Sequence, residues 1–429
     1  MTKPGAEIRR LRREAGASQE KLAETVGCSL RHLGEIERSG NCPPRILPDI
    51  VQALNKLRKP RGLPLVPPNL YLSEPPISNW LNLPMRQWSR ESHGPGALLT
   101  ADYRVVPFHG DKRLKERDDL VAWCLGSEHC GIRVYKGEGG SGKTRLALAV
   151  CDLLKDHPYG SWEVGFAQTK HFPIGRNIWT ALPDLSLPFL IVVDYAGEER
   201  KAQMIQDLLQ SVEECPAPKV RLLFLERDDH WLDRAYSDSR VRNLLLGPKL
   251  FRSREGVAAE LKPMASTPAE RTDSFNKATQ AFSELLGVNT RGLSLPRLSG
   301  PLYSRVLFIH IQALLHVFGE AGSGKTQVLE HLFHREREYW KQRIAALGLS
   351  LHLLPAVEEA VHRISLGEGV PDPTAALQRF RGSPILADQP EIVLVQIAAL
   401  LRECYPHGEH GIGPLQPDML RDFLTAYKQ

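Results

Sequence analysis

The chain lacks the features that mark a membrane or secreted protein. Its longest apolar stretch, Val306 to Phe318, is interrupted by His310, Gln312 and His316. A membrane-spanning helix needs roughly 20 apolar residues, so no span is expected. The first residues lead into a charged segment without the apolar run of a secretory signal. We therefore expect a cytoplasmic protein with no membrane partner.

Cysteine is scarce and irregularly placed. The seven cysteines, an odd number, lie at positions 28, 42, 124, 130, 151, 215 and 404 of 429 residues. A chain of this length does not need disulfide staples, so reduced thiols are expected. Cys404, His407 and His410 have side chains that could ligate a metal, but no convincing fourth ligand is nearby. A surface loop explains these three residues equally well.

The net positive charge of the chain is confined to its amino-terminal end. The net charge is +5, yet residues 1–62 hold 13 Lys and Arg against 7 Asp and Glu, and the remaining residues sum to −1. A local positive field attracts the phosphate backbone of nucleic acid. A solvated basic helix face would have the same charge count.

The same amino-terminal segment has the apolar spacing of a bundle of short helices. Four stripes recur at helical intervals: Ile8, Leu11 and Ala15; Leu22, Ala23 and Val26; Leu30, Leu33 and Ile36; Ile46, Ile50, Val51 and Leu54. Ser18 and Ser29 are expected N-caps, and glycines 16, 27 and 40 are expected helix ends. Between Gln19 and Ile36 the pattern is that of a helix-turn-helix, which we assign to residues 1–58. A helical protein-interaction module is the alternative.

This assignment predicts a set of contacts with double-stranded DNA. If Ser29 starts the recognition helix, Ser29, Arg31, His32 and Glu35 point outward. Arg31 could then reach guanine edges, whereas Gln19, Arg38 and Arg45 are better placed for phosphates. The predicted DNA-binding residues are Gln19, Ser29, Arg31, His32, Arg38 and Arg45.

The composition then changes twice. Seven prolines between positions 60 and 84 predict an extended linker, which we place at residues 59–97. From residue 98, strand-like and helix-like stretches alternate, as in an α/β fold with a parallel sheet. The expected strands are 132–135, 189–193 and 220–225, and the expected helices are 145–154 and 201–213. Beyond about residue 268 the pattern is mostly helical, with a break at 295–300.

A phosphate-binding loop is the most specific motif. Gly137 to Thr144 satisfies G-x-x-x-x-G-K-[ST], with an expected strand before it and a helix after it. Glycines let consecutive N–H groups turn toward phosphate oxygens, and the helix adds its positive end. The predicted nucleotide contacts here are Gly137, Gly139, Gly140, Ser141, Gly142, Lys143 and Thr144, with ATP or ADP as cofactor.

One acidic residue, Asp194, and one basic residue, Arg227, each follow an expected buried strand. At the carboxyl edge of a parallel sheet, such residues lie near the phosphate-binding loop. Asp194 follows the strand at 189–193 and is predicted to share Mg²⁺ with Thr144. Tyr195 occupies the place of a second carboxylate, so Glu198 or Glu199 could serve as the general base instead. Solvated charges at the start of a helix explain these two residues equally well. Arg227 follows the strand at 220–225 and could sense the γ-phosphate, or form only a surface ion pair. At most a slow ATPase is expected.

A second string of the same form, Gly319 to Thr326, has a different setting. The residues before it look helical, and no apolar strand ending in Asp follows it, because Ile392 to Val395 runs into Gln396. We interpret it as a loop between helices. A functional second nucleotide site is the alternative.

Two family resemblances extend this interpretation. Ile8–Arg12, Ser18–Ala23 and Gly34–Arg38 resemble the Cro/repressor (Xre) helix-turn-helix family, whose members bind operators as dimers. The stretch from about 99 to 345 resembles STAND signalling ATPases, relatives of NB-ARC and AAA+ modules. The similar residues are Val106–Gly110, Trp162–Phe166, Val193–Ala196, Leu261–Met264 with Glu270 and Arg271, and Gly300–Leu302. Asp111, directly after the first of these segments, stands where the family commonly has Arg.

The STAND resemblance implies a domain plan. Residues 98–290 would be the P-loop NTPase core, and residues 291–345 a helical lid in which Pro301 packs near the base. Pro414–Leu420 resembles a winged-helix region, so residues 346–429 are expected to be helical and winged-helix-like. No repeat array is found within the chain.

Together these features predict an ATP-regulated DNA-binding switch, a transcriptional regulator in which ATP and Mg²⁺ control conformation or self-association. A sensor or effector protein is a further expected partner. One alternative is a bacterial immune or toxin-control NTPase whose helix-turn-helix is autoregulatory or binds a partner. Another is a DNA-stimulated ATPase motor.

Overall fold

The computed structural model describes residues 4–39, 47–63, 66, 80–89, 93–155, 162–169, 172, 178–181, 186–227, 258–290, 293–407 and 410–428. The chain divides into two compact units. The first comprises Met1–Asn79 with Thr180–Pro183, and the second comprises Trp80–Trp179 with Asp184–Gln429. None of the described helices is long and apolar enough to span a membrane.

The described residues of the first unit form four α-helices around a small apolar core. They are α1 (Pro4–Glu14), α2 (Gln19–Val26), α3 (Leu30–Ser39) and α4 (Leu47–Arg58). The expected apolar stripes meet in one cluster that includes Ile8, Leu22, Leu33, Ile50 and Leu54.

The helix ends in this unit follow the expected chemistry. The Ser18 hydroxyl accepts a hydrogen bond from the Lys21 N–H, and Gly27 ends α2 in the left-handed conformation at φ 79°. Ser29 accepts in the same way from the His32 N–H. Leu30 differs from the prediction: it lies in the first turn of α3 and is 43% exposed. Gly40 and Ile46 lie outside the described residues.

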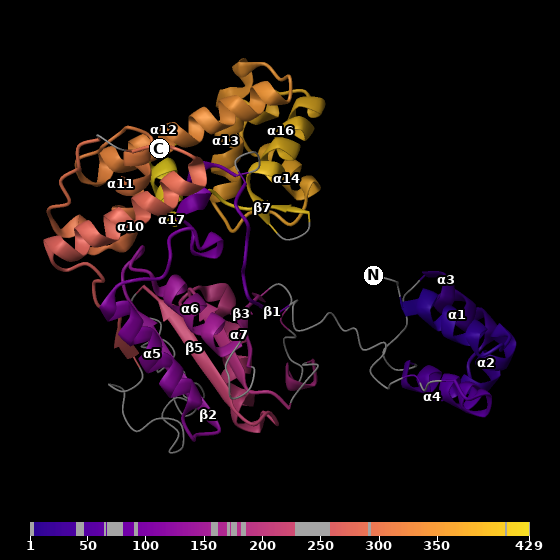
Figure 1. Cartoon of the computed structure of the whole chain (residues 1–429). Coiled ribbons are helices and arrows are strands. Elements are labelled where there is room, and N and C mark those ends of the chain that lie inside the picture. The colour runs from indigo at the N-terminus through magenta and orange to yellow at the C-terminus, as the bar shows by residue number, and fades with distance from the viewer. Residues whose placement is uncertain are drawn as a thin grey trace. The chain divides into compact units, whose positions relative to one another are not determined.

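The second unit contains a six-stranded sheet in the order β1-β3-β4-β5-β2-β6 (Figure 1). The strands are β1 (Leu81–Asn82), β2 (Cys130–Lys136), β3 (Glu163–Ala167), β4 (Phe189–Asp194), β5 (Val220–Glu226) and β6 (Ala258–Glu260). Among the described strands of this sheet, only β1 is antiparallel to its neighbour, and the other pairs are parallel. The three strands expected from the sequence are therefore present as β2, β4 and β5.

Helices cover this sheet, as the apolar runs of its strands require. Residues 189–193 and 220–225 are buried without alternation, which is typical of parallel strands covered on both faces. The covering helices are α5 (Asp111–Leu125), α6 (Lys143–Lys155) and α7 (Ala202–Ser211). Leu120 and Cys124 of α5 and Leu146 and Val150 of α6 share one core with β4 and β5.

The expected linker ends earlier than predicted. Trp80 is buried, and Leu81 and Asn82 pair with Ala167 and Phe166 at the edge of the sheet. The segment after it, Pro95–Leu99, forms a short 3₁₀ turn. Residues 80–89 and 93–97 therefore belong to the second unit, because the proline-rich composition does not prevent a short edge strand.

The remaining helices form a separate layer beside the sheet (Figure 1). They are α10 (Pro268–Leu286), α11 (Val306–Val317), α12 (Gly324–Ala346), α13 (Leu354–Ser365), α14 (Pro373–Phe380), α15 (Pro384–Ala387), α16 (Glu391–Cys404) and α17 (Asp418–Lys428). One continuous apolar core joins them, with Phe308, Leu314, Trp340 and Ile397 among its members.

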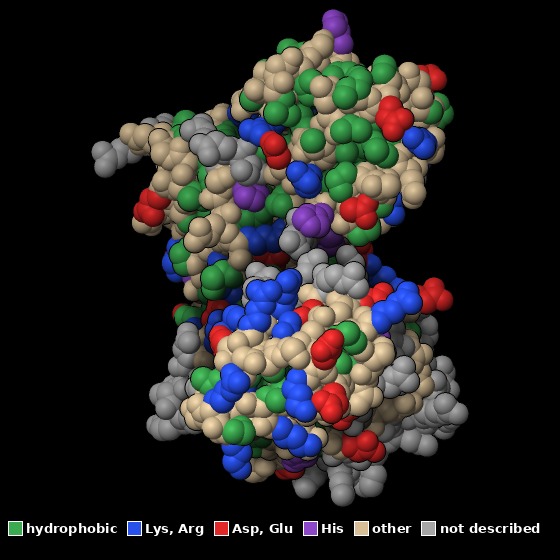
Figure 2. All heavy atoms as spheres, turned by 90° about the vertical axis from the view of Figure 1, so that its right-hand side faces the viewer, with side chains coloured by type: hydrophobic (Ala, Val, Ile, Leu, Met, Phe, Trp, Pro, Cys, Tyr) green, Lys and Arg blue, Asp and Glu red, His purple; other side chains and the backbone are tan. Residues whose placement is uncertain are grey.

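A small hairpin completes this layer. Strands β7 (Pro406–His407) and β8 (Gly411–Ile412) pair antiparallel, and Ile412 also bridges Val370 between α13 and α14. Hydrophobic side chains gather on part of the molecular surface in Figure 2. In this helical layer, Ile385 of α15 and Ile392 and Val395 of α16 are 50%, 65% and 45% exposed.

Candidate functional site

The loop from Gly137 to Gly142 joins β2 to α6 at the carboxyl edge of the sheet. Gly140 and Gly142 have φ values of 79° and 97°, which side chains with a Cβ rarely adopt. A Cβ on Gly140 would also lie 2.9 Å from the Cβ of Leu307. These glycines let the backbone curl tightly in front of the first turn of α6.

Lys143 is the first residue of α6 and is 9% exposed. Its ammonium donates to the carbonyl oxygens of Gly137 and Glu138, the latter at 3.3 Å. Burial lowers the pKa of Lys143, against the attraction of Asp194 and Glu226. The cation is thus held at the mouth of the loop.

Thr144 and Asp194 meet across two different elements. The Thr144 hydroxyl donates to Asp194 Oδ2 at 2.8 Å, although 50 residues separate them. The N–H of Tyr195 donates to Asp194 Oδ1 at 3.0 Å. Burial raises the pKa of Asp194 to about 6, while the Thr144 hydrogen bond and the nearby lysines oppose that rise.

These groups fit a nucleotide and a divalent cation. A glycine loop before a helix N-terminus presents N–H groups to phosphate oxygens. A hydroxyl and a carboxylate side by side are the hard oxygen ligands that Mg²⁺ prefers. The strand β5 lies between β2 and β4, so the sheet itself sets the spacing between the loop and Asp194.

Tyr195 occupies an unusual backbone position beside the loop. Its φ is 50°, which is uncommon for a residue with a side chain. The Nζ atom of Lys201 lies 5.5 Å from the centre of its ring, and the guanidinium carbon of Arg227 lies 5.9 Å away. Its hydroxyl donates to a carboxylate oxygen of Asp418, the first residue of α17.

Arg227 lies where the sequence predicts it, directly after β5, and lines a cavity that Lys143 and Asp194 also line. Its Nη2 atom is 3.4 Å from the Asp418 carboxylate. The surface ion pair that the sequence offers as the alternative would involve Asp228 or Asp229, which lie outside the described residues.

The two candidate bases differ in position. Glu198 lines the cavity and accepts hydrogen bonds or ion pairs from Arg200 at 2.7 Å and Lys201 at 2.8 Å. Burial opposes ionisation of Glu198, but these cations outweigh it and lower the pKa. Glu199 is exposed at the start of a 3₁₀ turn and does not line the cavity.

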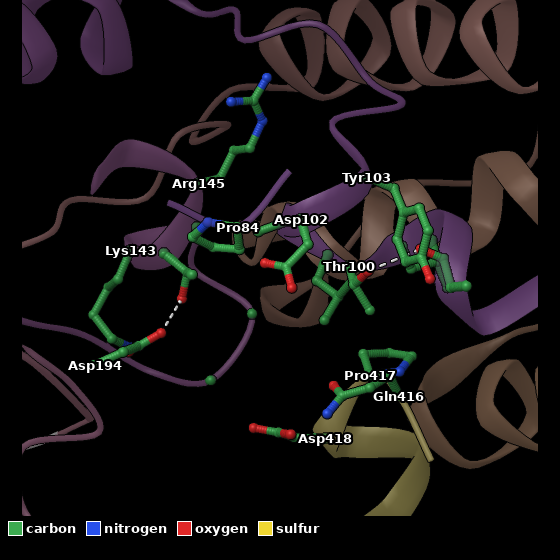
Figure 3. A pocket seen from close by; sticks show the side chains of 18 of the residues that line it. Pro84, Thr100, Asp102, Tyr103, Lys143, Arg145, Asp194, Gln416, Pro417 and Asp418 are labelled. Atoms are coloured by element: carbon green, nitrogen blue, oxygen red, sulfur yellow. Dashed lines mark hydrogen bonds between the residues drawn. The ribbon is translucent and has the colours of Figure 1, made fainter. Parts of the chain in front are cut away.

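A cavity of about 890 Å³ surrounds these residues. Figure 3 shows Lys143 and Asp194 at one end, with Thr100, Asp102 and Tyr103 further along and Gln416 to Asp418 opposite. Its size is near the upper end of the range for small-molecule sites.

The helical layer contacts the loop directly. The Leu307 N–H, at the start of α11, donates to the Gly140 carbonyl at 3.1 Å, and Arg305 pairs with Glu138. Pro301 begins a 3₁₀ turn and does not line the cavity; Val306, Leu307 and His310 do. Sequence motifs did not identify these three, because their approach to the loop depends on packing between distant segments.

Arg113 is a further residue that the motifs missed. It lies on α5, is 2% exposed, and lines the cavity. Its Nη2 atom donates to the Ser141 carbonyl at 2.8 Å, and Nη1 bonds to Glu116. Asp111, at the position where the resembled family has Arg, begins the same helix.

The second glycine string has no comparable surroundings. Gly319 to Thr326 joins α11 to α12, with a helix rather than a strand before it. Lys325 and Thr326 are exposed, and Ser323 bonds to Gln327 in the first turn of α12. Glu320 pairs with Arg335. In the part of the chain that the structure describes, no cluster of three or more metal-ligating side chains is present.

In the first unit, a buried ion pair fixes the helices. Arg12 binds Glu37 through two hydrogen bonds of 2.7 and 2.9 Å, and Gln19 donates to the same carboxylate at 2.9 Å. Gln19, predicted to contact phosphate, therefore has its amide directed to Glu37. Arg31 and His32 are exposed on α3, as is Ser29 before it. The Arg38 side chain and all of Arg45 lie outside the described residues.

Comparison with known proteins identifies this unit. Residues 5–58 match the family model described as a helix-turn-helix domain. The helix-turn-helix domain has α2 and α3 joined at Gly27 and Cys28, with Ser29 capping α3.

For the remainder of the chain the comparisons are distant. The sequence has no match among the curated proteins. The chain is similar to the solved structure of the Aeropyrum pernix ORC1 protein in complex with DNA, with 14% identity and a TM-score of 0.35 over 79% of this chain and 98% of that one. A score of this size does not establish a shared fold.

Proposed function

We propose that this protein is an ATP-regulated DNA-binding switch of the STAND type. The observation that carries the proposal is the contact between Thr144 and Asp194, at 2.8 Å, beside a glycine loop at the carboxyl edge of a parallel sheet. The second support is a helix-turn-helix domain in the same chain.

The nucleotide-binding part of the proposal assigns roles to the loop residues. Gly137, Gly139, Gly140, Ser141 and Gly142 hold the phosphates, Lys143 neutralises them, and Thr144 with Asp194 holds Mg²⁺. Bound Mg²⁺ neutralises phosphate charge between neighbouring oxygens. In this plan residues 98–290 are the NTPase core, 291–345 the lid and 346–429 a winged-helix-like region.

Slow turnover is part of the proposal. A fast ATPase needs a carboxylate free to orient water, whereas Tyr195 follows Asp194 and Glu198 is engaged by Arg200 and Lys201. A bound nucleotide would therefore persist, as a switch requires and a motor does not.

The switch has physical contacts through which occupancy can act. The loop bonds to Leu307 and Arg305, and Asp194 is joined through Tyr195 to Asp418 of α17. Phosphate groups bound at Lys143 would add negative charge beside these contacts. A ligand that favours one of two arrangements shifts the protein toward that arrangement. A shift between two arrangements of the helical layer would follow.

DNA binding is assigned to the helix-turn-helix domain, with Arg31 and His32 directed to base edges and Arg38 and Arg45 to phosphates. Arg9, Arg10 and Arg13 are exposed on α1 and add positive charge. Because one domain covers a single half-site, self-association is part of the proposal.

The nucleotide site is tested by two lysine variants measured with labelled ATP. Lys143→Ala should lower ATP affinity by about 100-fold or more, since it removes a charge buried against phosphate. Lys325→Ala, the matched lysine of the second glycine string, should bind as the wild type does. Equal loss in both variants, or loss only in Lys325→Ala, would overturn the assignment.

A further inference from the structure

His310 enters the cavity from α11 of the helical layer. It lines the cavity together with Phe108, His109 and Met264. Its ring centre lies 6.0 Å from that of His109, at an angle of 33°. Two imidazoles from segments about 200 residues apart are therefore neighbours on one wall.

These two histidines differ in how their hydrogen-bonding groups are used. His109 has both ring nitrogens engaged, Nδ1 with the Pro107 carbonyl at 2.8 Å and Nε2 with the Ser274 hydroxyl at 3.1 Å. Among the described residues, none forms a hydrogen bond with His310, whose Nε2 is fully enclosed. A buried polar atom without a partner costs free energy, so a turn of the His310 ring that brings Nε2 to a ligand in the cavity is favoured.

The His310 ring is neutral over the physiological pH range. Burial lowers the pKa of His310 to about 3, and the nearby charges of His109 and Arg145 act in the same direction. A neutral imidazole offers one donor and one acceptor and has no charge for a phosphate. It is suited to the edge of an uncharged heterocycle.

The surroundings of His310 also suit a heterocycle. Lys143, Thr144 and Asp194 provide the charged and hard-oxygen groups of the cavity. Val106, Phe108, Met264 and Val306 provide apolar wall beside the two histidines. Apolar walls with a few placed polar groups are typical of sites that orient an organic ligand.

We propose that His310 contacts the base of the bound nucleotide and sets the preference for nucleotides that have a base over free polyphosphate. This inference rests on the proposed function, because it presumes phosphates at Lys143. It adds a base-binding residue from α11 of the helical layer, the helix whose Leu307 N–H also donates to the Gly140 carbonyl.

The experiment compares ATP with inorganic tripolyphosphate, both with Mg²⁺, by calorimetry on the full chain. His310→Ala should weaken ATP binding about tenfold and leave tripolyphosphate binding unchanged. His310→Gln, which keeps a donor and an acceptor, should recover most of the ATP affinity. His316→Ala is the matched control, since His316 lies on the same helix, packs edge-on against Phe275 and does not line the cavity.

The other outcomes contradict either the base contact of His310 or the nucleotide site itself. Equal weakening for both ligands, or ATP affinity unchanged in His310→Ala, would overturn the base contact while leaving the nucleotide site intact. If the wild type binds neither ligand, the proposed function itself fails. A His310→Ala protein with lowered thermal stability is judged by His310→Gln, which must bind ATP more tightly than His310→Phe.

Discussion

Single residues in the second unit connect distant segments through polar groups. Glu336 of α12 is fully buried; it accepts hydrogen bonds from the Gly96 N–H and the Tyr405 hydroxyl, and Trp340 donates to Tyr405 at 2.7 Å. A Cβ on Gly96 would lie 2.1 Å from the Gln416 carbonyl oxygen. This network therefore joins the segment before α5 to α12 and to the approach to α17.

The ionisation of Glu336 predicts a pH dependence of stability. Burial raises the pKa of Glu336 to about 7 from an ordinary 4.5, against the hydrogen bonds from Gly96 and Tyr405. A carboxyl with a raised folded pKa contributes most below pH 4.5, and this contribution is lost as the pH rises toward 7. The free energy of unfolding of the wild type, minus that of Glu336→Gln, should fall by about 3 kcal/mol between pH 4.5 and 8.

Urea unfolding at several pH values checks this prediction. Glu338→Gln is the control, because Glu338 lies on the same helix, is partly exposed and pairs with Lys341. A wild-type minus Glu336→Gln difference that is constant with pH would show that Glu336 titrates normally in the folded protein.

At the scale of elements, the ends of β4, β5 and α17 meet at one point. Tyr195 follows β4, Arg227 follows β5, and both contact Asp418 at the start of α17. The Asp418 side chain is 15% exposed, so this contact is only partly screened by solvent. It joins the edge of the sheet that holds Asp194 to the last described helix.

Removing the Asp418 carboxylate should loosen this junction. In Asp418→Asn, bound nucleotide should dissociate about fivefold faster, because the hydrogen bond from Tyr195 loses its charged acceptor. Stopped-flow displacement of a fluorescent ADP analogue measures the rate. Asp422→Asn, one turn further on α17 at a side chain 58% exposed, should leave the rate unchanged. Equal rates in the wild type and Asp418→Asn would remove the junction from the account.

The elements with strong local patterns were predictable from the sequence. The apolar runs of β4 and β5 and the helix after Lys143 are present as expected. The two glycine strings are alike in letters, and the strand before one and the helix before the other separate them. His310, Leu307 and Asp418 could not be placed in advance, because their approach to the loop is determined by packing of the helical layer. Arg113 lies in a run of mostly charged residues, Asp111 to Asp119, and no motif set it apart.

The helix-turn-helix domain shows the same limit. Its core stripes and caps follow from local spacing, whereas the direction of the Gln19 amide depends on the buried pair of Arg12 and Glu37. A phosphate contact predicted from position alone did not account for that competing partner.

At the scale of the whole molecule, the account requires that nucleotide and DNA affect each other's binding. Coupling between two sites is a free energy, typically 1–3 kcal/mol or about 5 to 150-fold in affinity, and it is reciprocal. Salt must be held constant, since phosphate contacts make the affinity for DNA fall steeply with ionic strength.

The most direct test is the affinity for DNA measured by fluorescence anisotropy in three states: without nucleotide, with ADP and Mg²⁺, and with a non-hydrolysable ATP analogue and Mg²⁺. The probe is a duplex selected by the wild-type protein from random sequence. The account predicts that the dissociation constant differs by at least about fivefold between the ADP and ATP-analogue states, and that Lys143→Ala abolishes this difference while Lys325→Ala keeps it. A wild-type protein that binds nucleotide and DNA with the same dissociation constant for DNA in all three states would contradict the account.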